Sequence, residues 1–369
     1  MKPAPRLSLP AEETTFRACD TIIDTRSPAE FAEDHVPGAI SCPVLDNKER
    51  ARIGTIYQQV SPFEAKKLGA ALVARNIARH IETLFIRKEK NWSPLLYCWR
   101  GGKRSAAMAH VLREVGWDAR VLQGGYKAYR RYVVEALAAL PDRFSFRVIH
   151  GVTGSGKSRL LRALAAAGAQ VLDLENLAAH RGSVLGNLPE RPQPSQKMFE
   201  SLLLKSLAGL DFSKEIYVEG ESRKIGQLQL PEALIGRMRA SECLLLQADT
   251  TTRVALLMHE YRHFFADPAL LGAQLDCLAG LHGRERVGAW KALAAAGEWP
   301  ALVARLLEEH YDPAYRRSAA HNFPRLAEAQ VLPLDSADDS AFDCLARSLK
   351  DGPGRTSAGT LAVPARSTQ

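Results

Sequence analysis

The chain has 369 residues, of which 46% are hydrophobic and 24% charged, so it can bury the cores of two or three domains. It contains no apolar run of about eighteen residues and no signal-peptide core, so we expect a soluble, cytoplasmic protein without a membrane partner. Six scattered cysteines without CxxC spacing argue against a disulfide scaffold or a structural metal site, and the net charge of +8 favours a polyanionic partner such as RNA.

Short strands and helices alternate along most of the chain. Up to about residue 139, helix-like stretches separate β-like runs at 21–24, 94–98 and 119–125. A second series begins with an apolar strand at 144–150, which runs into a glycine-rich turn and a helix. Further strand candidates are QVLDLE, EIYVEGES and ECLLLQAD, and a helix-rich extension follows at about 251–330. This pattern predicts two α/β domains, the second with a parallel sheet and crossover helices.

Two segments stand apart from this alternation. Residues 44–92 form a long stretch with mostly helical spacing, and their basic side chains suit either a polyanion-binding face or an ordinary solvated surface. These basic residues are Lys66, Lys67, Arg75, Arg79, Arg87, Lys88 and Lys90. Residues 351–369 are rich in Gly, Ser, Thr and Pro, which predicts a disordered tail.

The segment LLYCWRGGKRS places a cysteine between an apolar strand and a helix that begins near Ser105. Loop amides in front of a helix carry partial positive charge, which stabilises a thiolate and any anion bound to it. The double glycine allows backbone angles that other residues avoid, and the neighbouring cations add donors. An inert buried cysteine is the alternative, but the combined features favour a catalytic group made of Cys98, Arg100, Lys103 and Arg104.

GVTGSGKS is a complete Walker A motif, with a strand before it and a helix after it. Its glycines allow the backbone amides to surround a diphosphate, its lysine bridges the outer phosphate, and its final hydroxyl is of the type that binds Mg²⁺. The predicted phosphate-binding residues are Gly151, Gly154, Ser155, Gly156, Lys157 and Ser158.

An NTPase also needs an acidic residue after an apolar strand, and the candidates are Asp173, Glu219 and Glu221. Glutamates at the EIYVEGES strand are atypical, so the loop either hydrolyses a nucleotide or holds a substrate that carries a diphosphate. Arg223 follows the same strand and is expected to face the cleft at the carboxyl edge of the sheet.

The stretch DTRSPAEFAEDHVPGAISCP resembles the opening of rhodanese-like domains, and LQGGYKAYRRY resembles their closing segment. The resemblance implies that Asp24 and Arg26 form a structural ion pair. Five residues separate Cys98 from Arg104, one more than in many single-domain rhodaneses. This is the spacing of cysteine phosphatases, so the loop suits a tetrahedral oxyanion.

CWRGGKRS fused to GVTGSGKS and VEGESRKIG is similar to the bacterial tRNA 2-selenouridine synthases. The resemblance implies a rhodanese-like domain (1–139, with its insertion at about 44–92) followed by a P-loop NTPase-like parallel α/β domain with a helical extension (140–350). It also implies a transferase that acts on wobble 2-thiouridine in a tRNA anticodon stem-loop.

In that family, selenophosphate and geranyl diphosphate are the co-substrates, and no cofactor is tightly bound. The phosphate loop would hold the diphosphate, and Cys98 would act in the selenium step; participation of Mg²⁺ is left open. The rival interpretations are a sulfurtransferase coupled to an ATPase, a cysteine phosphatase, and a non-enzymatic RNA-binding or sensor protein.

Overall fold

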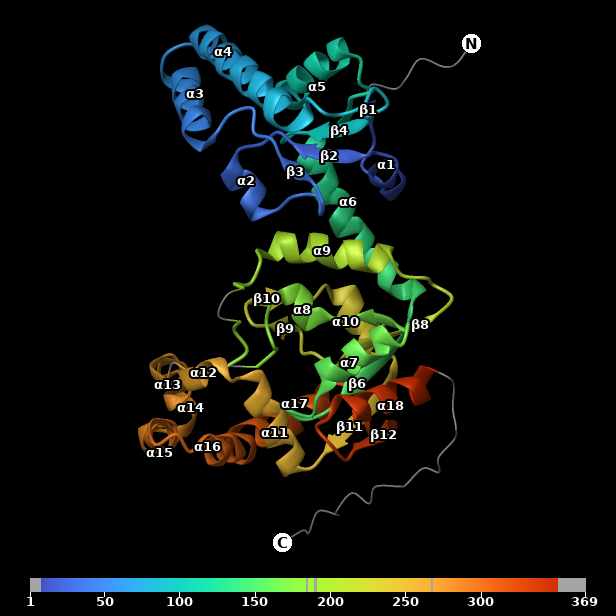
Figure 1. The fold of residues 1–369 in the computed structure, drawn as a ribbon, viewed down its shortest axis with the longest axis vertical. Coiled ribbons are helices and arrows are strands. Elements are labelled where there is room, and N and C mark those ends of the chain that lie inside the picture. Colours follow the sequence, from blue (N-terminus) through green and yellow to red (C-terminus); the bar gives the residue numbers. More distant parts are fainter. Residues whose placement is uncertain (1–7, 184, 189–190, 267, 351–369) are drawn as a thin grey trace. The chain divides into compact units, whose positions relative to one another are not determined.

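The computed structural model describes residues 8–183, 185–188, 191–266 and 268–350. The chain divides into two compact units (Figure 1): residues 1–140 and 194–209 form the first, and residues 141–193 and 210–369 form the second. Within the described ranges, no helix is both long enough and apolar enough to cross a membrane. The tail at 351–369, which was predicted to be disordered, lies outside the described residues.

A five-stranded parallel sheet forms the centre of the first unit, in the order β1-β5-β4-β2-β3. Its strands are β1 (Ser8–Leu9), β2 (Thr21–Asp24), β3 (Ile40–Ser41), β4 (Pro94–Tyr97) and β5 (Arg120–Leu122). All four residues of β4 are buried. A continuous apolar run suits this central position, because both faces of a parallel sheet are covered.

The helices of the first unit include a long hairpin at 47–80, formed by α3 and α4 (Figure 1). Asp46 begins α3 with a capping box, and the Ser61 hydroxyl caps α4, so a local signal marks the start of each helix. The helical segments in chain order are α1 (Glu13–Arg17), α2 (Pro28–Glu33), α3 (Asn47–Gln59), α4 (Pro62–His80), the π-helical turn η1 (Ile81–Phe85), α5 (Lys103–Val115) and α6 (Gly125–Ala139).

One further helix of the first unit, α9 (Gln196–Ala208), comes from much later in the chain. The sequence assigned all of 140–350 to the second domain, whereas the structure places residues 194–209 in the first unit. Ser201 of α9 donates a hydrogen bond of 2.8 Å to the buried carboxylate of Asp34, and Glu200 pairs with Arg130 of α6. Such long-range contacts leave no local signal in the sequence.

The second unit also contains a five-stranded parallel sheet, in the order β12-β11-β6-β8-β7. The 3₁₀ turn η2 (Leu140–Arg143) leads into it. Its strands are β6 (Ser145–His150), β7 (Gln170–Leu172), β8 (Glu215–Glu219), β11 (Glu242–Ala248) and β12 (Gln330–Leu334), and β9 (Lys224–Ile225) pairs with β10 (Leu228–Gln229) in a separate antiparallel ribbon. The associated helices are α7 (Lys157–Ala166), α8 (Leu174–Ala178), α10 (Glu232–Arg239) and α18 (Asp339–Lys350).

Between β11 and β12, the chain forms the predicted helical extension, which packs around the buried Trp290 and Leu275. Its segments are α11 (Thr250–Glu260), α12 (His263–Ala266), α13 (Pro268–Asp276), α14 (Ala279–His282), α15 (Arg284–Ala295), α16 (Trp299–Leu306), the π-helical turn η3 (Leu307–Tyr311), α17 (Asp312–Asn322) and the 3₁₀ turn η4 (Pro324–Glu328). The predicted fold class, α/β units with parallel sheets and an added helical region, is confirmed.

Candidate active sites

Cys98 follows β4 directly and precedes the loop that leads into α5. Its side chain is buried, with 3% of its surface exposed. The backbone N–H of Gly102 and the hydroxyl of Ser105 each donate a hydrogen bond of 3.2 Å to its Sγ atom. Gly102 is also the residue at the amino end of α5, where the helix dipole favours negative charge. The predicted nucleophile therefore lies at the amino end of a helix, with two hydrogen-bond donors directed at its Sγ atom.

The cysteine loop is packed tightly against the start of α6. Gly101 has a φ angle of +64°, and a Cβ atom there would lie 2.7 Å from the carbonyl oxygen of Leu122. A Cβ atom on Gly125 would overlap the carbonyl oxygen of Cys98, which accepts a hydrogen bond of 2.8 Å from the N–H of Tyr126. Glycine is therefore required on both sides of this contact.

The three predicted cations of the cysteine loop differ in their surroundings. Arg104 donates a hydrogen bond of 3.0 Å to Glu30 of α2. Burial acts to raise the pKa of Glu30, but hydrogen bonds from Arg104 and Ser27 outweigh it and leave the pKa below its ordinary value. Arg100 and Lys103 are exposed, and in the described part of the chain no ion pair is recorded for either. These two side chains are thus available to an incoming anion.

Asp24 and Arg26 form the ion pair that the sequence predicted. Arg26 is 1% exposed and Asp24 is fully buried, and an Nη atom of Arg26 lies 2.6 Å from a carboxylate oxygen of Asp24. The same guanidinium group donates to the carbonyl of Asp34 and lies over the ring of Tyr126. The pair therefore fixes α2 and α6 beside the cysteine loop.

The phosphate loop of the second unit connects β6 to α7, as the Walker A motif predicts. Gly154 and Gly156 have φ angles of +79° and +91°, and a Cβ atom on Gly154 would lie 2.7 Å from Leu257. Lys157 donates a hydrogen bond of 2.9 Å to the carbonyl of Gly151. The hydroxyl of Tyr315 accepts a hydrogen bond of 3.1 Å from the N–H of Gly151 and so attaches α17 to the loop.

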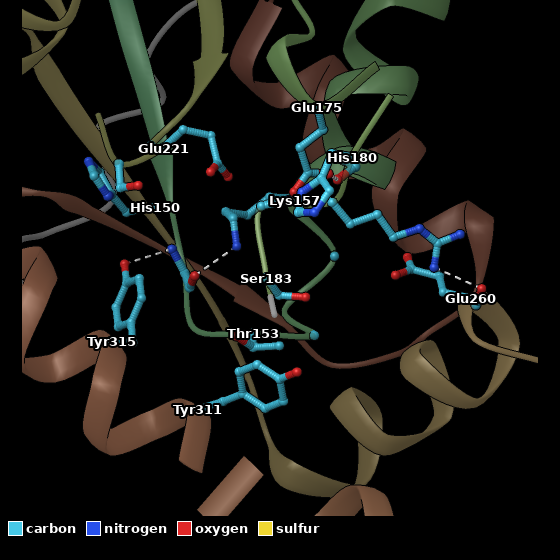
Figure 2. A pocket seen from close by; sticks show the side chains of 18 of the residues that line it. His150, Thr153, Lys157, Glu175, His180, Ser183, Glu221, Glu260, Tyr311 and Tyr315 are labelled. Atoms are coloured by element: carbon cyan, nitrogen blue, oxygen red, sulfur yellow. Dashed lines mark hydrogen bonds between the residues drawn. The ribbon is translucent and has the colours of Figure 1, made fainter. Parts of the chain in front are cut away.

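The loop borders a cavity of about 780 Å³ within the second unit. Figure 2 shows Lys157 near the centre of this cavity, with Glu175 and Glu221 on one side and Tyr311 and Tyr315 on the other. Six of the nine phosphate-site residues predicted from the sequence line the cavity: Gly151, Gly154, Gly156, Lys157, Ser158 and Glu221. Aromatic and aliphatic side chains form another part of its wall, namely Leu188, Leu257, Tyr261, Tyr311, Tyr315 and Phe323.

Carboxylates lie close to the phosphate loop. The Ser158 hydroxyl donates a hydrogen bond of 2.6 Å to Glu175, the residue two places after the predicted acid Asp173. Burial and the neighbouring Glu175 raise the pKa of Glu221 to about 7, although Lys157 opposes the shift. Burial also raises the pKa of Glu175, against the effects of Lys157 and Ser158. Near neutral pH, Glu221 is therefore present in both its protonated and its ionised form.

The other three of these nine residues, Ser155, Glu219 and Arg223, lie outside the cavity lining. Ser155 is a fully buried residue of the loop. Glu219 is fully buried as well, and it accepts a hydrogen bond of 3.0 Å from the N–H of Leu174. Arg223 is exposed and pairs with Glu232 at 3.0 Å rather than facing the cavity. Asp173 does line the cavity, while its carboxylate accepts a hydrogen bond from Asn176 and caps α8.

Sequence reasoning missed several cavity residues. Glu175 belongs to the QVLDLE segment, in which the candidate acid predicted from the sequence was Asp173. The segment was identified correctly, but the acidic residue beside Ser158 is Glu175. Tyr311 and Tyr315 come from the helical extension, more than 150 residues after the loop, and nothing near them marks a site. His150 precedes the motif directly; burial and Lys157 lower its pKa to about 4, and neither ring nitrogen has a hydrogen-bond partner among the described residues.

Together, a cysteine loop on a rhodanese-like parallel sheet and a Walker A loop on a second parallel sheet define the class of this two-domain protein. Comparisons with known families agree with this architecture. The rhodanese-like domain family matches residues 11–132, and the tRNA 2-selenouridine synthase AAA domain family matches residues 144–270.

Curated relatives of this chain carry the name tRNA 2-selenouridine synthase, and three of them illustrate the similarity. The Nitrosomonas europaea protein is 36% identical over 67% of this chain and 64% of its own length, and the Shewanella halifaxensis protein is 37% identical over 66% of each. The Psychromonas ingrahamii protein is 31% identical over 80% of this chain and 87% of its own length. The chain belongs to the tRNA 2-selenouridine synthase family. It spans just under two thirds of the length of the first two relatives.

Proposed function

We propose that this protein is a tRNA-modifying transferase that replaces the sulfur of wobble 2-thiouridine with selenium from selenophosphate. We further propose that the reaction passes through S-geranyl-2-thiouridine, formed from geranyl diphosphate. Family membership and the names of the relatives support the tRNA reaction. One observation supports the geranyl step above all: the cavity joins a phosphate-binding loop to an apolar, aromatic wall.

An amphipathic ligand suits both parts of this cavity. A diphosphate would lie against the amides of Gly151 to Ser158, and a hydrocarbon chain would lie against Leu257, Tyr311 and Phe323. A volume of about 780 Å³ is within the range of sites that enclose small organic ligands. To bind the diphosphate, Lys157 would exchange its hydrogen bond with the carbonyl of Gly151 for one with a phosphate oxygen.

In the first step, the thiocarbonyl sulfur of 2-thiouridine would attack the allylic carbon of geranyl diphosphate. A carbon–sulfur bond forms, the carbon–oxygen bond breaks, pyrophosphate leaves, and the N3 proton of the base passes to solvent. Lys157 and the loop amides are positioned to stabilise the negative charge that develops on the leaving group. The aromatic wall would exclude water from the allylic carbon, which limits hydrolysis.

The loop also offers ligands of the kind that Mg²⁺ prefers. Ser158 supplies a hydroxyl, and Glu175 and Glu221 supply carboxylate oxygens close to the loop. Within the part of the chain that the structure describes, no cluster of three or more His, Cys, Asp or Glu side chains has metal-binding geometry. When bound, the ion would be held jointly by these side chains and the diphosphate, and it would neutralise charge on the leaving pyrophosphate.

In the second step, selenium would replace the geranylated sulfur at C2 of the base. Geranylation converts the sulfur into a thiol leaving group, so the Cys98 thiolate would form a carbon–sulfur bond at C2 as geranyl thiol departs. The selenium of selenophosphate would then attack C2 and displace the Cys98 thiolate, and water would cleave the phosphorus–selenium bond so that phosphate leaves. Arg100, Lys103 and Arg104 would hold the selenophosphate, with Arg104 fixed in position by Glu30.

Mass spectrometry of tRNA nucleosides tests this proposal directly. The protein is incubated with tRNA that carries 2-thiouridine, together with geranyl diphosphate and selenophosphate. We expect Cys98→Ser to accumulate S-geranyl-2-thiouridine without 2-selenouridine, and Lys157→Ala to form neither product although it still binds tRNA. Full selenation by Cys98→Ser would contradict the assignment of the selenium step to Cys98. A requirement for ATP, measured in parallel, would instead place a nucleotide in the phosphate loop.

A further inference from the structure

The α3–α4 hairpin, residues 47–80, has an unusual concentration of positive charge. It contains seven Lys or Arg residues and only two acidic residues, Glu49 and Glu64. Its net charge of +5 therefore accounts for more than half of the chain's net charge of +8. All seven basic side chains are exposed, namely Lys48, Arg50, Arg52, Lys66, Lys67, Arg75 and Arg79.

The two acidic side chains of the hairpin are engaged within it. Glu49 accepts a hydrogen bond of 2.8 Å from Asn76 and so joins α3 to α4, and Glu64 pairs with Lys67. Of the seven basic side chains, only Lys67 and Arg50 have a recorded ion pair among the described residues. The other five present uncompensated positive charge to the solvent.

The sequence of α3 is explained poorly by packing. None of its thirteen residues is buried, and Ile53 and Ile56 are only partly covered. At the turn between the two helices, Tyr57, Val60 and Phe63 are exposed by 53%, 71% and 65%. Exposed aromatic rings among cations are typical of surfaces that bind RNA, because the rings stack on bases while the cations bind phosphates.

The start of α3 is connected to the cysteine loop. Asn47 accepts a hydrogen bond from the N–H of Ala29 in α2, and Arg50 lies 3.3 Å from Glu30. Glu30 in turn holds Arg104, six residues after Cys98. Because α3 is about 20 Å long at 1.5 Å per residue, the hairpin extends from the neighbourhood of the reactive cysteine to its aromatic turn.

We propose that the α3–α4 hairpin is the tRNA-docking surface of this protein. The phosphate backbone of the stem-loop lies along the exposed cations, and this places the wobble base at Cys98. Tyr57 and Phe63 contact an unpaired nucleotide about 20 Å from the reacting base. A protein partner would leave the positive charge without the dense row of anions that a phosphate backbone supplies. The inference rests on the proposed function, since that function requires an RNA substrate.

Fluorescence anisotropy with full-length tRNA that carries 2-thiouridine tests the surface. The hairpin variant Lys48→Ala/Arg52→Ala/Lys66→Ala loses three cations without removing a buried side chain. We expect its affinity to fall by at least about tenfold, and its slope of log affinity against log salt to decrease by about two units. The control Arg284→Ala/Arg305→Ala/Arg347→Ala removes the same charge from exposed positions of the second unit and should change affinity by less than about twofold.

A second variant tests the aromatic turn without a change in charge. Tyr57→Ala/Phe63→Ala should weaken binding of full-length tRNA by roughly tenfold and leave the salt slope unchanged. Equal affinities of the two triple variants, or unchanged binding by the aromatic variant, would overturn the docking surface.

Activity measurements on the same variants test the proposed function separately from the docking surface. At saturating tRNA, the hairpin variant should form 2-selenouridine at nearly the wild-type rate, with only the KM for tRNA increased. If the wild-type protein binds tRNA through the hairpin but forms no 2-selenouridine, the docking surface stands and the proposed function fails. If 2-selenouridine forms normally but the hairpin variant retains full affinity, the docking surface fails alone.

Discussion

Glu221 is a buried carboxyl group that lines the cavity with the lysine of the phosphate loop, and its protonation changes the charge of the cavity. Because burial and Glu175 raise its pKa to about 7, Glu221 is mostly neutral below this pH and mostly ionised above it. In the proposed reaction, an ionised Glu221 would repel the diphosphate. We therefore expect the affinity for geranyl diphosphate without Mg²⁺ to fall by about tenfold relative to Glu221→Gln as the pH rises from about 6 to about 8.

Isothermal titration of both proteins across this pH range provides the measurement, and Glu221→Gln also corrects for the titration of the ligand itself. Parallel pH profiles of the two proteins would contradict the prediction. Added Mg²⁺ should reverse the trend in the wild-type protein, because an ionised Glu221 is the better ligand for a cation.

At the scale of single residues, the sequence was informative where a site is contiguous. Cys98 and Lys157 each belong to a short motif, CWRGGKRS or GVTGSGKS, whose residue spacing predicts an anion-binding loop. The structure places each motif between a strand and a helix. Tyr315 enters the cavity from a distant helix, which no local pattern marks. Arg223 has the expected backbone position after β8, but its long side chain reaches the carboxylate of Glu232 at the surface.

At the scale of elements, Gly125 and Gly102 of the cysteine site differ in whether the surrounding structure has room for a side chain. A methyl group on Gly125, which has a φ angle of +59°, would overlap the carbonyl of Cys98. On Gly102, whose φ angle is −98°, a methyl group would meet no atom within 4 Å. We expect Gly125→Ala to lower the free energy of unfolding by roughly 3 kcal/mol, and Gly102→Ala to change it by less than about 0.5 kcal/mol.

Thermal and urea denaturation measure both effects, and alkylation of Cys98 by iodoacetamide reports on the loop itself. Alkylation should change in Gly125→Ala and stay near the wild-type rate in Gly102→Ala. Equal stability of the two variants would mean that the packing of α6 on the loop does not hold the cysteine in place.

Gly124 and Gly125 explain why the sequence predicted one element boundary imprecisely. The apolar run at 119–125 predicts one strand, but β5 ends at Leu122 and α6 begins at Gly125. Gly124 and Gly125 have φ angles of +72° and +59°, which no strand can accommodate. The two-residue strands β1 and β3 carry no periodicity that a pattern could reveal, because their pairing partners lie elsewhere in the chain.

At the scale of the whole molecule, the order of the sequence and the division into units do not coincide. The chain passes from the first unit to the second near residue 140, returns for residues 194–209, and then passes to the second unit again. Sequence motifs indicated both units. They could not assign α9, because the amphipathic pattern of a helix does not reveal which unit the helix packs against. Its assignment depends on contacts such as that between Ser201 and Asp34.

Those contacts predict that a substitution in α9 weakens the first unit. Asp34 is fully buried and accepts hydrogen bonds of 2.8 Å from both Ser201 and Tyr126. Burial raises the pKa of Asp34, and these hydrogen bonds oppose the shift. Ser201→Ala removes one donor, so we expect a loss of about 1–3 kcal/mol in the stability of the first unit. Ser206→Ala, on the same helix, is the control, because no side-chain hydrogen bond is recorded for Ser206 among the described residues.

Hydrogen–deuterium exchange followed by mass spectrometry distinguishes the two units within the intact chain. In Ser201→Ala, amides of β2, β4 and α6 should exchange faster, whereas those of β6 and β11 should keep their wild-type rates. Because Tyr126 donates its hydroxyl to Asp34 and its N–H to the carbonyl of Cys98, faster exchange should extend to the cysteine loop. Faster exchange confined to the second unit would show that α9 stabilises the phosphate-binding unit instead, and that the division of the chain into units must be redrawn.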